Sequence, residues 1–364
     1  MDHKKSSLQR IAYGLAIIVL GYIIMKHGQF ILGPLTFALL LTVMLAPLSD
    51  FFERLVKFKI PAILLTLLSV TAVLGVIITL FSVQLTSIIS ELPNITEKVN
   101  QGIRQIMDWV NQNLNLNKSE IQKNIPSLLD TSVNYIKKGI SFSSAFIFNL
   151  LYTLLLVFFL LWYKDSFHGF LLTQSKKDSR EEFKGMLLQI NKTLQHYLYG
   201  LLGVIAILAV LNSIGLLIIG IDYAVFWGVL AAFLAVIPYI GTTLGGMLPF
   251  LYAIATAGNF WQPLAVLGMY VVIQQIEGNI ITPNVVGSSV SINPLIALLA
   301  ILVGGVVWGI SGIILAIPII AVIKIFLEHN NSTRAIAALM SNKVHKQDEK
   351  FWQDMDEDKY RMGR

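Results

Sequence analysis

One acidic side chain stands alone in the C-terminal half of the sequence. Between Asp222 and Lys324, Glu277 is the only Asp, Glu, Lys, Arg or His. A charge deep in a bilayer costs at least about 2.5 to 3.5 kcal/mol, so such a residue normally faces a water-filled path, a partner or a bound ion, or stays protonated. We therefore predict that Glu277 contacts a transported cation, proton or polar solute.

Amide side chains and a helix breaker surround Glu277. Gln274 lies three residues before it and shares its face of a helix, and Gln275 and Asn279 add two further amides. Pro283 weakens the helix and leaves backbone carbonyl groups that can coordinate a cation or a polar solute. The alternative is that Glu277 lies near the cytoplasmic headgroups, where a charge costs little, and stabilises the break by hydrogen bonds.

Two further apolar regions, residues 223–257 and 293–327, are short and interrupted by Gly and Pro. Paired interrupted segments of this kind point to the binding region of a transporter. The predicted path therefore also includes Pro238 and Gly241, which lie at a break, and Asp222, which precedes the first region.

The two interrupted regions also resemble each other. Their matching residues are Trp227, Gly228, Leu234, Ala235 and Pro238 in the first, and Trp308, Gly309, Leu315, Ala316 and Pro318 in the second. Two alternatives explain this similarity: an internal repeat, or a chance match in apolar sequence.

The composition indicates which elements must position these residues. Of the 364 residues, 55% are hydrophobic and 13% are charged, about half the charged fraction of a soluble domain. The uncharged runs between Lys138 and Lys164 and from Ile60 to Ser90 each exceed the roughly 20 residues that a membrane helix needs. Lipid cannot satisfy bare backbone amides, and these runs do not alternate, so helices are favoured over a barrel. We predict an all-α polytopic membrane protein with about eight membrane helices, including short Gly/Pro-broken segments in the C-terminal half.

The apolar pattern divides the chain into six parts. Apolar residues recur at steps of three and four from Ile88 to Val110, which predicts an amphipathic helix in a helical extracytoplasmic insertion. The predicted parts are membrane helices 1–3 (1–83), the insertion (84–140), membrane helix 4 (141–163), a cytoplasmic amphipathic helix (164–196), a C-terminal membrane core with broken helices (197–327) and a cytoplasmic tail (328–364).

The distribution of charge predicts the orientation. The net charge is +6, and most of the 27 Lys and Arg lie in segments that alternate spans place on one side. By the positive-inside rule that side is the cytoplasm, which places both termini there. The basic excess is thus a topology signal with some contact to anionic lipid, and no nucleic-acid partner is expected.

Signatures of enzymes are missing from the sequence. It has no cysteine, its six histidines are scattered, and HExxH, GxSxG and P-loop motifs do not occur. We therefore expect no catalytic residue, no metal site and no cofactor, and transport that is passive or ion-coupled because this chain cannot hydrolyse ATP.

Several motifs resemble one family of membrane proteins. The block QQIEGNIITPNVVG (Gln274–Gly287), the runs IPYIG (Ile237–Gly241) and GGMLP (Gly245–Pro249), and PLSDFFER (Pro47–Arg54) are similar to signatures of the autoinducer-2 exporter (AI-2E) family, the PerM-like permeases. The resemblance extends over nearly the whole chain. It implies a cytoplasmic-membrane permease with about eight membrane helices that assembles as a homo-oligomer, with a pentamer as the suggested form.

The resemblance also implies substrates. Members of the family are associated with export of autoinducer-2 (AI-2), and some with sodium/proton exchange. Relatives often carry basic residues after the proline and a His before the Pro-Leu pair, where this chain has Asn284, Ser288, Ser289 and Asn293. A role of those charges with an anionic or sugar-like substrate does not carry over to this chain.

Three functions follow from these observations. The first is export of a small polar solute such as AI-2 without ATP hydrolysis. The second is sodium (or lithium)/proton exchange with Glu277 as the carrier site. The third is a non-transporting membrane scaffold that acts through the outer helices or the tail.

Overall fold

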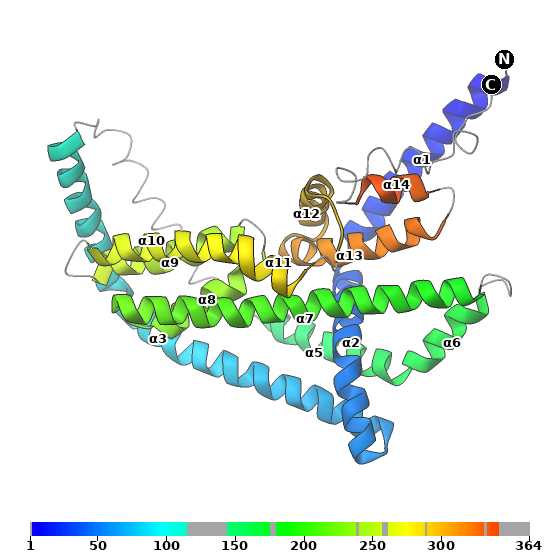
Figure 1. Cartoon of the computed structure of the whole chain (residues 1–364), viewed down its shortest axis with the longest axis horizontal. Coiled ribbons are helices and arrows are strands. Elements are labelled where there is room, and N and C mark those ends of the chain that lie inside the picture. Colours follow the sequence, from blue (N-terminus) through cyan, green and yellow to red (C-terminus); the bar gives the residue numbers. More distant parts are fainter. Residues whose placement is uncertain are drawn as a thin grey trace. The chain divides into compact units, whose positions relative to one another are not determined.

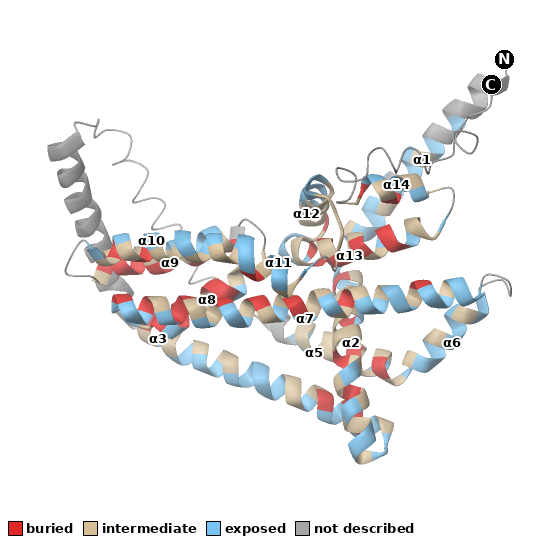
Figure 2. Ribbon diagram, in the orientation of Figure 1, coloured by how far each residue is buried: buried red, intermediate tan, exposed pale blue. Residues whose placement is uncertain are grey.

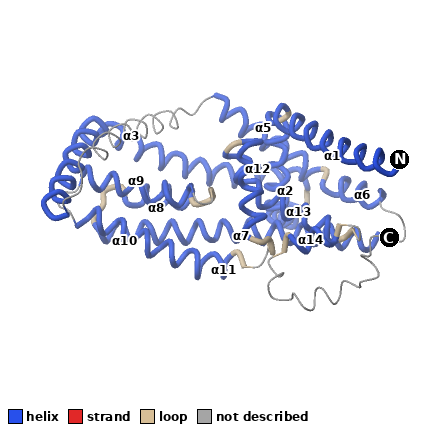
Figure 3. Tube along the Cα trace, turned by 90° about the horizontal axis from the view of Figure 1, so that it is seen from above, coloured by secondary structure: helices blue, strands red, loops and turns tan. Residues whose placement is uncertain are grey.

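A computed structural model describes residues 2–114, 144–174, 180–237, 240–256, 261–287, 290–330 and 333–341 (Figure 1). In these ranges the chain forms helices and short connections and no strand, which confirms the all-α prediction (Figure 3). The helices are α1 (Asp2–His27), α2 (Gln29–Val56), α3 (Lys59–Leu114), α5 (Ser144–Trp162), α6 (Lys164–Gln174), α7 (Arg180–Ile219), α8 (Ala224–Leu234), α9 (Ile240–Thr256), α10 (Trp261–Ile276), the π-helix η2 (Glu277–Ile281), α11 (Thr282–Val285), α12 (Pro294–Trp308), α13 (Ile310–Glu328) and α14 (Arg334–Leu339).

The described helices include five that are long and apolar enough to cross a membrane. They lie at Gln29–Val56, Lys59–Ile88, Arg180–Ile219, Trp261–Val285 and Ile310–Glu328. A sixth is added if α5 and α6, which bend by 63° at their junction, count as one span. The protein is therefore a multi-pass membrane protein, and the predicted number of eight membrane helices is not confirmed.

Two helices join segments that the sequence pattern separated. α3 has 56 residues and continues without a break past residue 83, so the third predicted membrane helix and the first amphipathic stripe of the insertion form one helix. α7 has 40 residues and joins the predicted cytoplasmic amphipathic helix to the following span. The second amphipathic stripe of the insertion, residues 121–136, lies outside the described residues.

Contacts divide the chain into two compact units. The first unit contains residues 1–63, 153–199 and 287–364, and the second contains residues 64–152 and 200–286. Exposed Leu, Ile, Val and Phe side chains are numerous on the helices of both units, as expected for surfaces that face lipid. Figure 2 shows the exposed residues in pale blue.

In the second unit, α8 is the most buried helix (Figure 2). Phe226 and Trp227 of α8 belong to a core that includes Tyr252 of α9, and the Trp227 and Tyr252 rings lie 5.3 Å apart. α9 packs against both neighbours through glycines, because a methyl group at Gly245 would lie 3.0 Å from Ala231 of α8 and one at Gly246 would lie 3.1 Å from Tyr270 of α10. Small residues thus allow these three helices to approach closely.

In the first unit, α12 and α13 form a hairpin. The sequence predicted that residues 293–327 are interrupted by Gly and Pro, and the structure shows two short arms, α12 and α13, that meet at a break at Gly309. Gly309 has φ 62° and ψ −138°, a conformation that glycine adopts and other residues avoid. The arms cross with backbone in contact, since a methyl group at Gly312 would stand 1.9 Å from the carbonyl oxygen of Gly304.

The end of α1 binds the turn of this hairpin. Lys26 Nζ donates to the carbonyl oxygen of Val306 at 3.1 Å, and Trp308 Nε1 donates to that of Met25 at 2.9 Å. Lys26 thus satisfies a carbonyl in the last turn of α12, where a cation also interacts favourably with the helix dipole.

The internal repeat considered from the sequence is wrong as a structural repeat. Trp227 is buried inside α8, whereas Trp308 is the last residue of α12. Leu234 ends α8, whereas Leu315 lies inside α13. The matched residues occupy different places in their helices, so the similarity does not reflect equivalent folds.

Candidate functional site

The predicted break at Glu277 is a π-helix. η2 begins at Glu277, directly after α10, and ends at Ile281, directly before α11. The backbone N–H of Thr282 donates to the carbonyl oxygen of Glu277, five residues earlier, which is the π-helical pattern. Pro283 has no N–H and cannot donate to a carbonyl of the preceding turn. Short π-helical segments inside membrane helices frequently lie at functional sites.

The Glu277 carboxylate accepts two hydrogen bonds from neutral groups. Gln274 Nε2 donates to Oε2 at 2.5 Å, and Thr282 Oγ1 donates to Oε1 at 2.8 Å. The wider π turn brings Thr282, five residues on, to the carboxylate, so the break itself builds this site. The sequence predicted the Gln274 partner from its spacing, but it gave no indication of Thr282.

The other predicted amides lie beside this carboxylate along the helix. Asn279 Nδ2 donates to the carbonyl oxygen of Gln275 at 2.9 Å and to its Oε1 at 3.2 Å. Gln274, Gln275 and Asn279 are exposed, and Glu277 is half-buried. The break therefore presents a polar face within the candidate span Trp261–Val285.

The opposite side of the break is apolar and packs within the second unit. Ile281 is 7% exposed and clusters with Val204 and Leu208 of α7 and Ala232 of α8. The partly buried Val285 and Val286 pack against the same cluster. This cluster around Ile281, the hydrophobic anchor, therefore packs one side of the break and leaves the polar side facing outward.

Two glycines of α7 allow the residues after the break to pack closely against this helix. A methyl group at Gly200 would stand 2.9 Å from Cα of Val286, and one at Gly203 would stand 2.9 Å from Cγ1 of Val285. Sequence reasoning missed both glycines. A signal was present, because the two glycines lie three residues apart on one helix face, and small residues on a face of an apolar helix allow close helix contacts.

Asp222 lies near the start of α10, whereas Glu277 follows the end of α10. Gln262, at the start of α10, donates to the carbonyl oxygens of Ile219 and Gly220 at the end of α7, and Asp222 follows in the exposed connection to α8. Glu277 is about 22 Å further along α10 at 1.5 Å per residue. The structure does not bring Asp222 and Glu277 together.

The remaining predicted residues fall at the connection between α8 and α9. A methyl group at Gly241 would stand 1.5 Å from the carbonyl oxygen of Leu234, so this tight reversal requires glycine. Gly241 thus has a structural reason for its identity. Pro238 lies outside the described residues.

The arrangement can bind a cation, a proton or a polar solute. Within the described ranges, no Lys, Arg or His forms an ion pair with Glu277. Those ranges also contain no group of three or more His, Cys, Asp or Glu that could hold a metal ion. A carboxylate with neutral donors and no counter-ion is suited to a monovalent ion or to the hydroxyl groups of a solute.

A second polar group lies in the first unit and was missed by the sequence reasoning. Lys324, taken from the sequence as the end of the uncharged stretch, is 8% exposed and pairs with Glu328 at 2.7 Å. The spacing of four residues on one helix was the available signal.

Comparison with known proteins identifies relatives over most of the chain. Residues 14–332 match the model of the family described as AI-2E family transporter. The chain is 25% identical over 338 residues to "AI-2 transport protein TqsA" of Escherichia coli (strain K12), covering 91% of this chain and 95% of that protein. It is 28% identical over 297 residues to "Putative transport protein YueF" of Bacillus subtilis (strain 168), covering 75% and 78%. A 33% identical match to "Putative transport protein YrrI" of the same organism covers 42% and 43%.

Proposed function

Because the chain belongs to the AI-2E family of transporters, we propose that it is a permease that exports a small polar solute without hydrolysing ATP. AI-2 is the leading candidate solute, since the relative TqsA is named for AI-2 transport and matches 91% of this chain. The proposed location is the bacterial cytoplasmic membrane with both termini in the cytoplasm, which the distribution of Lys and Arg supports. Assembly as a homo-oligomer is part of the proposal and follows from the family resemblance.

The observation that carries the proposal is the Glu277 carboxylate at the π-helical break. It lies inside a candidate membrane span and accepts hydrogen bonds from Gln274 and Thr282. A site that stabilises an acid with neutral donors, beside exposed amides, offers a passing solute both acceptors and donors. The hydrophobic anchor around Ile281 keeps this polar face in place while solute passes.

The test measures AI-2 outside and inside cells that lack the protein and cells that express it. Expression of the wild type is expected to raise the ratio of external to internal AI-2, and Glu277→Gln is expected to lose most of that increase. Glu182→Gln, the same change on an exposed acid in the first turn of α7, serves as the matched control. Equal ratios with and without the wild-type protein contradict export of AI-2.

A second function, sodium (or lithium)/proton exchange, is supported by one specific observation. Within the described ranges, the charge of Glu277 has no cationic partner, so an external Na⁺, Li⁺ or proton is suited to neutralise it. In proteoliposomes with an internal pH dye, added Na⁺ or Li⁺ is expected to move protons through the wild type and not through Glu277→Gln. If Glu277→Gln exchanges ions as the wild type does, Glu277 is structural and this function is wrong.

A further inference from the structure

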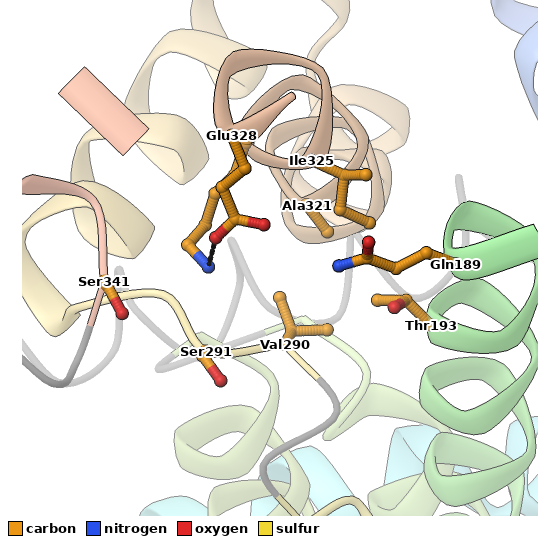
Figure 4. Close-up of a pocket in the computed structure, with 9 residues that line it drawn as sticks. Gln189, Thr193, Val290, Ser291, Ala321, Ile325, Glu328 and Ser341 are labelled. Atoms are coloured by element: carbon orange, nitrogen blue, oxygen red, sulfur yellow. Dashed lines mark hydrogen bonds and ion pairs between the residues drawn. The ribbon is translucent and has the colours of Figure 1, made fainter. Parts of the chain in front are cut away.

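The first unit contains a polar cavity at the end of α13. Its volume is about 240 Å³. Polar side chains from four segments line it: Gln189 and Thr193 from α7, Ser291 from the segment before α12, Lys324 and Glu328 from α13, and Ser341 after α14 (Figure 4). The volume lies just below the roughly 300–1,000 Å³ of pockets for drug-sized ligands, so the cavity fits a smaller solute.

Several polar groups of this cavity have hydrogen-bonding capacity to spare. The Lys324 ammonium has three donors, and the one acceptor recorded for it in the described residues is Oε1 of Glu328 at 2.7 Å. Gln189 and Thr193 lie four residues apart on α7, so their side chains share the face that lines the cavity. Figure 4 shows the Gln189 amide directed toward α13.

The charges of the cavity select against ions. Lys324 and Glu328 form an ion pair with each other, so together they carry no net charge. An anion bound to the ammonium meets the Glu328 carboxylate beside it, and a cation bound to the carboxylate meets the ammonium. A neutral molecule with several hydroxyl groups meets neither repulsion, because each hydroxyl both donates and accepts.

The cavity also has an apolar wall for the carbon skeleton of such a molecule. Val290, Ala321 and Ile325 contribute this wall. The hydroxyl groups and C–H surfaces of a small polyol or monosaccharide match this mixture of polar and aliphatic side chains. We propose that this cavity is a binding site for a small neutral polyhydroxylated solute.

Hydrogen bonds connect two of the segments that line the cavity. Asn293 Nδ2 donates to the carbonyl oxygen of Leu339 at 2.6 Å, and its backbone N–H donates to that of Met340 at 2.8 Å. These bonds tie the segment that carries Ser291 to the segment that carries Ser341. Bonds that hold these segments together reduce the conformational entropy that binding has to cost.

The site is tested by direct binding to the purified full-length protein in detergent. The probes are ribitol and D-ribose as neutral polyols, and inorganic phosphate as the ionic comparison. Titration calorimetry and thermal unfolding are expected to show saturable binding of the polyols and none of phosphate. Thr193→Val, which keeps the side-chain shape and removes the hydroxyl, is expected to weaken polyol binding roughly threefold to tenfold, the effect of one lost hydrogen bond.

Two further variants control this experiment. Thr173→Val removes the exposed hydroxyl of α6, which does not line the cavity, and is expected to bind as the wild type does. The double variant Lys324→Met/Glu328→Gln removes both charges together and is expected to fold, as paired replacements of buried ions usually do, while losing more than tenfold in affinity. Binding is measured without flux, so its failure leaves the proposed export function untouched.

Three results overturn the proposal. They are the absence of any saturable polyol binding, wild-type affinity in both Thr193→Val and the double variant, and binding of phosphate in place of the polyols.

Discussion

Two glutamates in the C-terminal half of the chain have opposite surroundings. Glu277 lies at a π-helical break inside a candidate span and accepts hydrogen bonds from the neutral Gln274 and Thr282. Glu328 ends α13 and pairs with Lys324, whose side chain is 11% exposed. The described partners of the Glu277 carboxylate are neutral, whereas the Glu328 carboxylate pairs with a cation on its own helix.

This difference separates two kinds of chemistry. A charge without a counter-ion in an apolar span favours whatever neutralises or solvates it, which suits an ion or a passing polar solute. A buried ion pair has no net charge to offer and instead presents a fixed pattern of donors and acceptors.

The largest expected change in stability concerns the crossing of α12 with α13, the helix that contains Lys324 and Glu328. In Gly312→Ala the new methyl group would lie 1.9 Å from the carbonyl oxygen of Gly304. That oxygen belongs to the backbone and cannot move aside as a flexible side chain can. We expect the free energy of unfolding to fall by about 3 kcal/mol, the upper part of the range for overpacking. Thermal unfolding in detergent measures this, and polyol binding is expected to be lost with it. Gly309→Ala is not a suitable control, because the positive φ there adds strain of its own.

The next largest effect contrasts the two glutamates directly. Glu328→Gln leaves the Lys324 ammonium buried without its counter-ion, which is expected to cost about 2 kcal/mol because Glu328 itself is partly exposed. Glu277→Gln replaces a carboxylate that has neutral partners, so the melting temperature is expected to change little while transport is lost.

Asp50→Asn serves as the matched control for Glu328→Gln. Asp50 pairs with Lys164 in the same unit, but these side chains are 45% and 28% exposed. Pairs at that exposure contribute about 0 to 1 kcal/mol. Equal losses of stability in Asp50→Asn and Glu328→Gln contradict the contrast drawn between a solvated pair and a buried one.

A smaller effect is expected at the segment that fixes the cavity wall. Asn293 Oδ1 accepts from the backbone N–H of Ile296 at 2.8 Å and so caps α12, while Nδ2 binds Leu339. Asn293→Ala loses both bonds and is expected to lower the free energy of unfolding by about 1 kcal/mol. Asn293→Asp keeps the cap and loses the donor to Leu339, so unfolding experiments should place it between Asn293→Ala and the wild type. If Asn293→Asp and Asn293→Ala are equally destabilised, the contact with Leu339 carries most of the effect.

The smallest expected change in stability concerns the break at Glu277. In Gly200→Ala, the strain against Val286 is partly offset by the higher helix propensity of alanine, about 1 kcal/mol, so the net change is a few tenths of a kcal/mol. Because the methyl group displaces α11, transport is expected to fall several-fold all the same. Gly185→Ala on the same helix has open space for its methyl group and should retain wild-type transport with unchanged or higher stability. Full transport by Gly200→Ala would show that the position of the break relative to α7 does not matter.

Local features of the sequence predicted much of this structure correctly. Continuous apolar runs predicted helices that can cross a membrane, and glycines predicted an interruption within residues 293–327, which the structure places at Gly309. Pro283 predicted a break beside Glu277, and the spacing of Gln274 predicted that its amide shares a helix face with Glu277, where the structure shows their hydrogen bond. These features depend on the hydropathy and conformational preferences of neighbouring residues, which a sequence displays directly.

Other residues had roles that the sequence did not reveal. Asn293 was noted as a departure from the relatives at a substrate-related position, and the structure shows it capping α12 and binding the segment after α14. Gly241 was predicted to lie on the path, and it is required by the tight connection after Leu234. The resemblance between the Trp227 and Trp308 regions suggested a repeat, but the two tryptophans lie at different places in their helices.

By itself, the amino-acid sequence determined the membrane class of the protein, the interruption of its apolar segment 293–327 and the isolated acid at residue 277. The tertiary structure alone decided that Thr282 reaches Glu277, that Gly200 admits α11, and that Gln189 and Thr193 share a cavity with Lys324 and Glu328. The physical reason is that helix formation follows from neighbours along the chain. Which helix faces meet depends on close contacts between residues far apart in it, and an apolar sequence offers many equally hydrophobic faces.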